Sequence, residues 1–296
     1  MDINLALLIE RFGNDATCRK TLERLRWPKG VQCPRCQGKG FSRVRERDIF
    51  DCNSCRHQFS VTAGTIFHDS HLPLNKWFMA IYLIVESKKG ISANQMKRML
   101  GISYKTSWYL CHRIRAAMTE AQPRKLNGTV EVDETFVGGK GHGQSTGRGT
   151  LNKILVAGIV QRGGDVRMSV IQRADKKTLK AFIDQFADDK TKEIMTDEWL
   201  GYRSLGDHNT KHYTINHAKK QWVRGTVHTN TIENVWSLLK RSIIGSYHKV
   251  SKKHLDAYLD ELEWRFNNRK NPYLFRDTLR KLLGAGQLEF RELIAS

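Results

Sequence analysis

The chain has 296 residues, enough for two or three domains, and 40% of them are hydrophobic, which allows a buried core. It carries 50 Lys and Arg against 30 Asp and Glu, a formal net charge of +20. This excess indicates a polyanionic partner, most commonly nucleic acid, with an anionic membrane surface as the alternative. No run of about 18 uncharged apolar residues is present, so no membrane span is expected. The acidic start Met1–Asn4 does not fit a signal peptide, and a cytoplasmic, nucleoid-associated protein is expected.

Residues 4–27 alternate apolar and charged side chains at helical spacing, which predicts one or two short helices. Two Cys-x-x-Cys pairs follow, separated by fifteen residues. In a cytosolic chain this pattern favours metal over disulfides or free thiols, and it matches a zinc ribbon. One Zn²⁺ is expected, bound by Cys33, Cys36, Cys52 and Cys55. It would be structural, because four cysteines leave no open position for a substrate.

The ribbon is predicted to contain hairpin strands at 41–45 and 49–51 and a third strand at 58–61. Cys18 has no partner at metal-ligand spacing and is expected to be a buried small residue. Five arginines decorate the module and suit contact with phosphate groups. They are Arg35, Arg43, Arg45, Arg47 and Arg56.

A helix is predicted from Pro73 to about Lys89, and two more at 92–100 and 104–118. Ser92 and Ser103 are suitable N-caps for the last two, which a glycine turn separates. This is the helix-turn-helix pattern, and the alternative is a plain helical hairpin. The basic charge and the adjacent ribbon favour DNA binding. The second helix is expected to expose a polar and basic face formed by Tyr104, Lys105, Thr106, Ser107, His112, Arg113 and Arg115.

Residues 129–137 are rich in β-prone side chains and predict a strand that a glycine pair ends. Three acids lie within it: Glu131, Asp133 and Glu134. Burying an unpaired carboxylate is costly, and a bound cation would remove that cost. Asp133 is therefore predicted to lie at the centre of a sheet and to hold a divalent metal. The alternative is an edge strand with solvated acids.

After a predicted linker at 122–128, three strands, a helix, two strands and a second helix follow in order. The strands are 130–137, 154–161, 165–172, 193–197 and 212–215, and the helices are 176–187 and 229–244. A loop rich in glycine and basic residues, 138–152, follows the first strand and includes Lys140, His142 and Arg148. This is the order of the ribonuclease-H-like fold, a mixed sheet flanked by helices. The amphipathic segment 251–269 is expected to pack on that sheet rather than to contact DNA.

The fold class predicted for the whole chain is therefore α+β multidomain. Residues 1–70 are assigned to N-terminal helices and a zinc ribbon, and residues 71–122 to a helix-turn-helix segment. Residues 123–296 are assigned to a ribonuclease-H-like mixed α/β catalytic domain with C-terminal helices.

In such a fold the first strand supplies one acid, and the fourth strand ends beside it with another. Asp133 and Asp197 occupy these two positions. A third ligand is expected from the last helix, where Glu233 and Lys240 share a face two turns apart. Asn230 lies one turn before Glu233 on nearly that face. The alternative is that all these acids are surface charge.

Taken in order, these motifs resemble the DDE transposases of small bacterial insertion sequences, in the group that has an N-terminal zinc ribbon. The resemblance spans roughly residues 18–270. Its pieces are the two cysteine pairs, Val132–Lys140, Thr196–Trp199, His228–Asn234 with Lys240, and Tyr258–Arg269.

The resemblance implies a polynucleotidyl transferase that cleaves element ends by hydrolysis and joins the freed 3′-hydroxyl to target DNA. It implies about two catalytic Mg²⁺ ions, with Mn²⁺ as a substitute, held by Asp133, Asp197 and Glu233. Asn230 is the alternative third ligand, and Glu233 is favoured because a carboxylate binds a hard cation better than an amide. Lys240 would contact a phosphate near the cut.

The expected partners are the terminal inverted repeats, target DNA and further copies of the chain in a dimer or larger assembly on the DNA ends. A non-catalytic DNA-binding regulator derived from a transposase is the main alternative. A simple nuclease of the same fold is less favoured, because non-specific cutting needs no end recognition.

Overall fold

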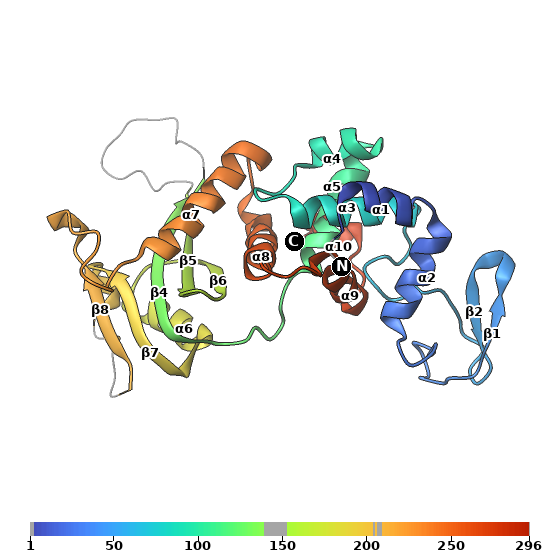
Figure 1. The fold of residues 1–296 in the computed structure, drawn as a ribbon, viewed down its shortest axis with the longest axis horizontal. Coiled ribbons are helices and arrows are strands. Elements are labelled where there is room, and N and C mark those ends of the chain that lie inside the picture. Colours follow the sequence, from blue (N-terminus) through green and yellow to red (C-terminus); the bar gives the residue numbers. More distant parts are fainter. Residues whose placement is uncertain (1–2, 139–152, 204, 206–208, 296) are drawn as a thin grey trace. The chain divides into compact units, whose positions relative to one another are not determined.

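The computed structural model describes residues 3–138, 153–203, 205 and 209–295 (Figure 1). The basic loop at 138–152, with Lys140, His142 and Arg148, lies outside the described residues apart from Gly138. The chain divides into two compact units, residues 1–119 with 269–296, and residues 120–268. The C-terminal segment, assigned from sequence to the catalytic domain, therefore groups with the N-terminal unit. None of the described helices is long and apolar enough to cross a membrane.

The N-terminal unit begins with two short helices, α1 (Leu5–Phe12) and α2 (Asp15–Arg26). The side chains of Asn4 and Asn14 cap them by accepting backbone N–H groups. A small antiparallel sheet follows, in the order β1-β2-β3, formed by β1 (Phe41–Val44), β2 (Ile49–Cys52) and β3 (Gln58–Phe59). Cys18 is fully buried, as predicted, and burial raises the pKa of its thiol to about 12.

Three helices continue this unit: α3 (Leu74–Glu86), α4 (Ala93–Leu100) and α5 (Tyr104–Ala116). The predicted caps are present, since Ser92 Oγ accepts the N–H of Gln95 at 3.2 Å and Ser103 Oγ accepts that of Thr106 at 3.0 Å. Gly101 ends α4 with φ of 60°, a left-handed conformation that glycine adopts without strain. The segment α4–turn–α5 has the predicted helix-turn-helix form.

The prediction that α5 exposes one continuous basic face is wrong. Ser107, His112, Arg113 and Arg115 are buried, and only the first turn, Tyr104–Thr106, is exposed. The guanidinium of Arg113 donates to the carbonyl of His68 at 2.7 Å and lies 5.1 Å from the Trp77 ring centre. A long cationic side chain can be buried when carbonyls and aromatic faces surround it, which a helical pattern does not reveal.

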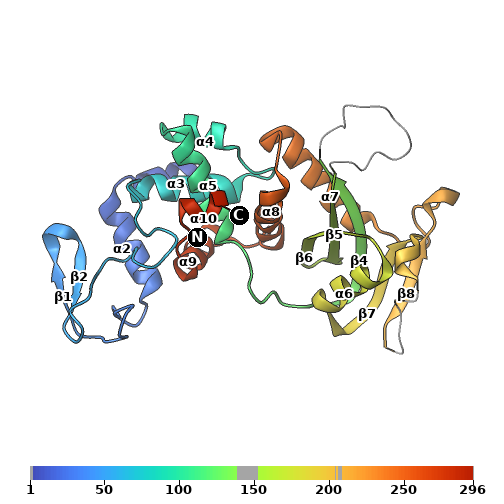
Figure 2. The same ribbon diagram turned by 180° about the vertical axis from the view of Figure 1, so that it is seen from behind.

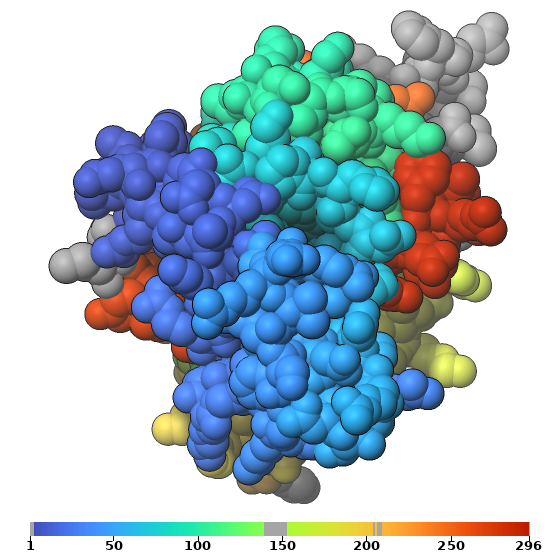
Figure 3. All heavy atoms as spheres, turned by 90° about the vertical axis from the view of Figure 1, so that its right-hand side faces the viewer, coloured from blue at the N-terminus to red at the C-terminus, as the bar shows by residue number. Residues whose placement is uncertain are grey.

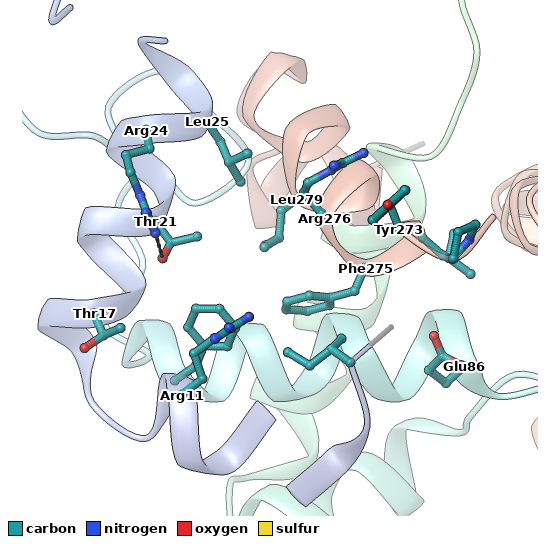
Figure 4. Close-up of a pocket in the computed structure, with 14 residues that line it drawn as sticks. Arg11, Thr17, Thr21, Arg24, Leu25, Glu86, Tyr273, Phe275, Arg276 and Leu279 are labelled. Atoms are coloured by element: carbon teal, nitrogen blue, oxygen red, sulfur yellow. Dashed lines mark hydrogen bonds between the residues drawn. The ribbon is translucent and has the colours of Figure 1, made fainter. Parts of the chain in front are cut away.

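The C-terminal helices α9 (Leu274–Gly284) and α10 (Phe290–Ala295) complete the N-terminal unit. The Phe275 ring lies 6.0 Å from that of Phe12 and 5.8 Å from that of Phe78. Phe290 of α10 contacts Tyr109 of α5, and Figure 3 shows this C-terminal segment in red beside the green and cyan helices. A cavity of about 630 Å³ lies where α2 faces α9, with Arg24 and Arg276 at its walls (Figure 4).

The second unit is built on a five-stranded mixed sheet in the order β6-β5-β4-β7-β8. Its strands are β4 (Leu126–Val137), β5 (Ile154–Gln161), β6 (Val166–Ile171), β7 (Ala187–Asp197) and β8 (Lys211–Ile215). Strands β4, β5 and β6 are antiparallel neighbours, and β7 and β8 run parallel to β4. This is the predicted ribonuclease-H-like fold. Because β4 is central, the edge-strand alternative for the three acids is wrong.

The strand β4 begins earlier than the sequence indicated, inside the predicted linker. Leu126 is buried and pairs with Ala187 of β7. The register shifts at Gly128, which has φ of 68°. The glycine marks an irregularity within the strand rather than a boundary before it.

Helices cover both faces of this sheet (Figures 1 and 2). On one face, α6 (Lys176–Phe186) packs on Val130, Val132 and Ile159. On the other, α7 (Asn230–Ser242) and α8 (Leu255–Asn267) pack on β5 and β6. Successive β4 residues therefore point to opposite layers, so Glu131 and Asp133 face α7 while Glu134 faces the α6 layer.

Helix α8 also covers the edge strand β6. Asn267 Oδ1 accepts the N–H of Val166 at 2.8 Å, and its amide donates to the Val166 carbonyl at 3.1 Å. Glu263 accepts the N–H of Met168. Unpaired groups on an edge strand invite pairing with another chain, and α8 satisfies three backbone groups of β6. The prediction that this segment packs on the sheet is confirmed.

Candidate active site and zinc centre

The four predicted zinc ligands lie together in the ribbon. Cys33 Sγ is 3.7 Å from Cys55 Sγ, Cys36 Sγ is 3.5 Å from Cys52 Sγ, and all four sulfurs lie within 4.8 Å of one another. Tetrahedral zinc–thiolate bonds of about 2.3 Å imply sulfur separations of about 3.8 Å. Backbone N–H groups of Cys55 and Ser54 lower the pKa of Cys52 to about 6, which favours the thiolate. The cluster fits one Zn²⁺.

The acids Asp133 and Asp197 lie on the same face of the sheet, at neighbouring positions. In the parallel pair β4–β7 the last paired residues are Glu131 and Met195, and each acid follows two residues later; the charge of Asp197 contributes to the raised pKa of Asp133, so the two carboxylates lie near each other. Asp197 is the last residue of β7, where strand becomes loop. The two positions predicted from the element order are therefore adjacent.

Trp236 of α7 holds the Asp133 side chain. Its indole Nε1 donates to Asp133 Oδ2 at 2.8 Å. The indole lies against β5 at Gly158, the residue that pairs with Asp133 across β4–β5. A Cβ on Gly158 would lie 2.4 Å from Trp236 Cη2 and 3.0 Å from Ile232 Cδ1. A glycine here gives the indole room to reach the carboxylate, and nothing in the sequence motifs had indicated this.

The electrostatics of the two acids favour a bound cation. Burial, together with the charges of Glu134 and Asp197, raises the pKa of Asp133 to about 7. Burial also raises the pKa of Asp197. Like charges and a low dielectric oppose ionisation, and a divalent cation would reverse both effects. Two oxygen-ligand acids in this state fit a hard cation such as Mg²⁺.

Glu131 lies on the same face of β4 as Asp133 and anchors α7. It is fully buried and accepts the backbone N–H groups of Thr231 at 2.7 Å and Ile232 at 3.0 Å. Arg162 Nε donates to it at 2.7 Å, and His228 Nδ1 lies 3.2 Å away. A carboxylate at a helix N-terminus satisfies amides that lack helical partners. Glu131 is thus a positioning residue, since it fixes the start of the helix that carries the other candidates.

The third-ligand candidates lie at the start of α7, and both are exposed. Glu233 Oε1 accepts the Thr229 hydroxyl at 2.9 Å and lies 3.8 Å from His217 Nε2. At 100° per residue, Glu233 and Lys240 lie about 60° and 40° around the helix from Trp236, whereas Asn230 lies about 120° away. Among the described residues, Asp133, Asp197 and Glu233 do not form a three-ligand cluster within 4.8 Å.

His217 is a site residue that the sequence motifs did not reveal. It opens a short 3-10 turn (His217–Lys219), and Glu198 accepts the backbone N–H groups of His217 at 2.8 Å and Ala218 at 3.0 Å. A protonated His217 would offset a small part of the rise that burial causes in the pKa of Asp197, and its Nε2 lies 3.8 Å from Glu233 Oε1. The only sequence signal was the acid Glu198, directly after Asp197, whose role is to hold this turn.

A zinc ribbon joined to a ribonuclease-H-like sheet with two adjacent central acids defines the class of DDE-type transposases. Residues 125–267 match the ISXO2-like transposase domain, and residues 13–58 match the transposase zinc-ribbon domain. The chain therefore carries one domain that resembles an ISXO2-like transposase domain and another that resembles a transposase zinc ribbon.

Two curated relatives agree with this placement. A protein of Halobacterium salinarum described as an uncharacterized protein in transposable element ISH50 is 29% identical over 276 residues, which is 87% of this chain and 92% of the relative. An uncharacterized transposase-like protein of Haemophilus influenzae is 33% identical over 75 residues, 25% of this chain and 59% of that protein.

Two solved structures show a distant likeness. One is the Mos1 strand transfer complex, with a TM-score of 0.32, 9% identity, and coverage of 70% of this chain and 75% of that one. The other is a simian T-cell lymphotropic virus intasome bound to PP2A regulatory subunit B56 gamma, with a TM-score of 0.30, 13% identity, and coverage of 57% and 63%.

Proposed function

We propose that this protein is a metal-dependent DNA transposase that cleaves the ends of an insertion element and joins them to target DNA. The observation that carries the proposal is the pair Asp133 and Asp197, side by side at the centre of the sheet with raised pKa values. A structural role would not require two buried like charges, whereas a divalent cation makes them favourable.

In this proposal the chain's own groups each have one task. Asp133 and Asp197 hold the cation site, Trp236 keeps the Asp133 carboxylate in place, and Glu233 completes the ligand set from α7. Two Mg²⁺ ions, when bound, supply an activated oxygen nucleophile and stabilise the departing 3′ oxygen. Glu233 would exchange its bond with the Thr229 hydroxyl for the cation. Lys240, on the same stripe of α7, would bind the phosphate beside the cut.

The reaction is proposed to have two stages. Water attacks the phosphodiester at the element end and releases a 3′-hydroxyl. That hydroxyl then attacks a target phosphodiester, so that one bond forms as another breaks and no ATP is needed. Both stages need the same acids, so loss of Asp133 should stop cleavage and joining together.

The N-terminal unit is proposed to bind the terminal inverted repeats. The five ribbon arginines are exposed, as phosphate contact requires. In a helix-turn-helix the first residues of the second helix contact base edges, and the exposed first turn of α5, Tyr104–Thr106, fits this role. Assembly of two or more copies on the paired ends is part of the same proposal.

The test compares Asp133→Asn and Asp197→Asn with Asp184→Asn, an exposed acid of α6 paired only with Lys180. The first two variants should lose cleavage of uncut ends and joining of pre-cut ends in Mg²⁺, while keeping end binding. Asp184→Asn should keep all three. Near-normal joining by Asp133→Asn would overturn the catalytic assignment and leave the DNA-binding regulator as the better account.

The third ligand is tested in the same assay. Glu233→Gln should abolish activity if Glu233 is the ligand, since it keeps the shape and removes the charge. Asn230→Ala should then leave much of it. The reverse pattern would assign the ligand to Asn230 and make Glu233 a positioning residue.

A further inference from the structure

Exposed aromatic side chains of the catalytic unit lie near the ends of the strands that carry Asp133 and Asp197 and near His217. Of the unit's described residues, three aromatics are largely exposed: Phe136 at 46%, Trp199 at 41% and Trp222 at 58%. Phe136 lies three residues after Asp133 on β4, and Trp199 lies two residues after Asp197. Trp222 packs on the His217 ring. Leaving an aromatic ring at the surface gives up the free energy that its burial would provide. Several exposed rings in one region therefore indicate a surface that binds a ligand.

Phe136 and Trp199 line one groove of about 740 Å³ at the edge of the sheet where β4, β6 and β7 end. Residues that end β6 and precede α6 also line it, and among them Ala174 accepts the indole N–H of Trp199. The volume lies within the range of about 300–1,000 Å³ found for ligand sites. The groove lies at the same end of the sheet as the candidate active site but on the α6 side of β4, and Trp199, two residues after Asp197, connects the two.

Trp199 is held rigidly in this groove. Its indole Nε1 donates to the carbonyl of Ala174 at 2.8 Å, and its backbone N–H donates to Asp197 Oδ1 at 3.0 Å. Gly201 allows this close packing, because a Cβ there would lie 2.9 Å from the Ala174 carbonyl oxygen and 3.0 Å from Trp199 Cδ1. The indole N–H is thus fixed, while 41% of the residue remains exposed.

The charges that line the groove are mainly positive. Lys153, Arg173 and Lys252 line it against a single acid, Asp175. That acid is already engaged, since it pairs with Arg173 at 3.2 Å and accepts the N–H of Thr178 at 2.9 Å to cap α6. Cations beside fixed aromatic faces are the combination that binds single-stranded nucleic acid.

We propose that this groove binds unpaired nucleotides of the DNA strand that enters the active site, with one base stacked on Trp199. Bases in a duplex stack on each other, so only an unpaired base presents a face to the indole. Lys153 and Lys252 would contact the phosphates on either side. The inference rests on the proposed function, because only a protein that acts on DNA would bring a DNA strand to this groove.

The experiment uses the full zinc-loaded chain without Mg²⁺, so that no cleavage occurs. The probe is a DNA duplex whose end carries a short unpaired extension containing 2-aminopurine, whose fluorescence falls when the base stacks on an aromatic ring. The wild-type protein should quench the extension more than the same base placed inside a paired end. Trp199→Ala should lose the difference and bind the unpaired extension about fivefold or more weakly.

Controls separate stacking from damage. Trp199→Ala keeps the backbone N–H that Asp197 accepts, and Trp199→Phe should restore part of the quenching because it keeps a ring face. Tyr273→Ala removes an exposed aromatic of the N-terminal unit and should change nothing. Melting followed by circular dichroism would check that each variant folds.

Equal quenching by Trp199→Ala and wild type would overturn the proposal. An equal loss of affinity for paired and unpaired ends would also overturn it, since the groove would then hold duplex backbone. The outcome is separable from the proposed function: cleavage in Mg²⁺ with no Trp199 effect leaves only the transposase assignment standing. A Trp199 effect without cleavage leaves only the groove.

Discussion

The zinc ribbon and the catalytic sheet differ in how the proposed metal sites relate to folding. The buried apolar side chains of the ribbon are few, a cluster around Phe50 and Phe59 that includes two of the cysteines themselves. The sheet has two extensive apolar layers, one against α6 and one against α7 and α8. In the ribbon, metal binding is coupled to folding. In the sheet, the two apolar layers stabilise the fold, and the fold brings the two acids together.

Loss of zinc should have the largest effect. Cys36→Ser should reduce bound zinc to near zero and unfold the ribbon, because such a small core cannot offset the entropy of ordering the loop. The thermal transition of the catalytic unit should be unchanged. Metal analysis together with hydrogen exchange resolved by segment would measure both.

Serine at Cys18, which is buried but not among the clustered thiols, is the matched control and should keep zinc. Full zinc retention in Cys36→Ser would contradict the four-cysteine assignment.

An added methyl group at Gly158 should have the next largest effect, this time on the catalytic sheet alone. Gly158→Ala places a Cβ 2.4 Å from the Trp236 ring, so the ring or α7 must move. Overpacking of this kind costs about 1–3 kcal/mol, and the carboxylate of Asp133 would lose its indole partner as well. Denaturant unfolding and end cleavage should both decline.

Gly163→Ala, in the β5–β6 turn with φ of 74° and open space around it, separates backbone strain from the clash. It should reduce stability without a specific loss of cleavage. Equal effects of the two substitutions on cleavage would remove the special role of Gly158.

Trp236→Phe should have a smaller effect on stability and a specific effect on metal use. Phenylalanine keeps most of the packing but removes the N–H that Asp133 accepts at 2.8 Å. We expect the Mg²⁺ concentration for half-maximal cleavage to rise about 10-fold or more, as for other outer hydrogen bonds to metal ligands. An unchanged Mg²⁺ requirement with reduced stability would make Trp236 a packing residue only.

The residues chosen for these variants differ in whether they could be predicted from the sequence. The cysteine spacing, the order of elements and the central position of Asp133 were all predictable, because each depends on local pattern or on fold order. Trp236 and Gly158 were not, because their relation exists only after α7 crosses β5. The buried Arg113 looked like a surface cation for the same reason: its partners, His68 and Trp77, lie far away in sequence. The position of His217 near Glu233 could not be predicted either, because it depends on the turn whose backbone N–H groups Glu198 accepts.

A pH dependence of stability is also expected from α8. Burial raises the pKa of Glu263 from 4.5 to about 8. The folded state therefore keeps a proton that the unfolded state releases, so this contribution to stability is complete below pH 4.5 and declines as the pH rises to about 8. Glu263→Gln should remove that decline, and its melting temperature relative to wild type should be higher at pH 8 than at pH 5. A constant difference between the two proteins across this range would contradict the raised pKa.

The comparison between the two metal regions rests on the claim that the folded sheet binds a divalent cation through Asp133 and Asp197. The most direct measurement is the melting temperature of the catalytic unit in zinc-loaded protein as Mn²⁺ is added. A ligand that binds only the folded state raises this temperature with concentration. We predict a rise in wild type and in Asp184→Asn and none in Asp133→Asn or Asp197→Asn. An equal rise in all four proteins would contradict the account.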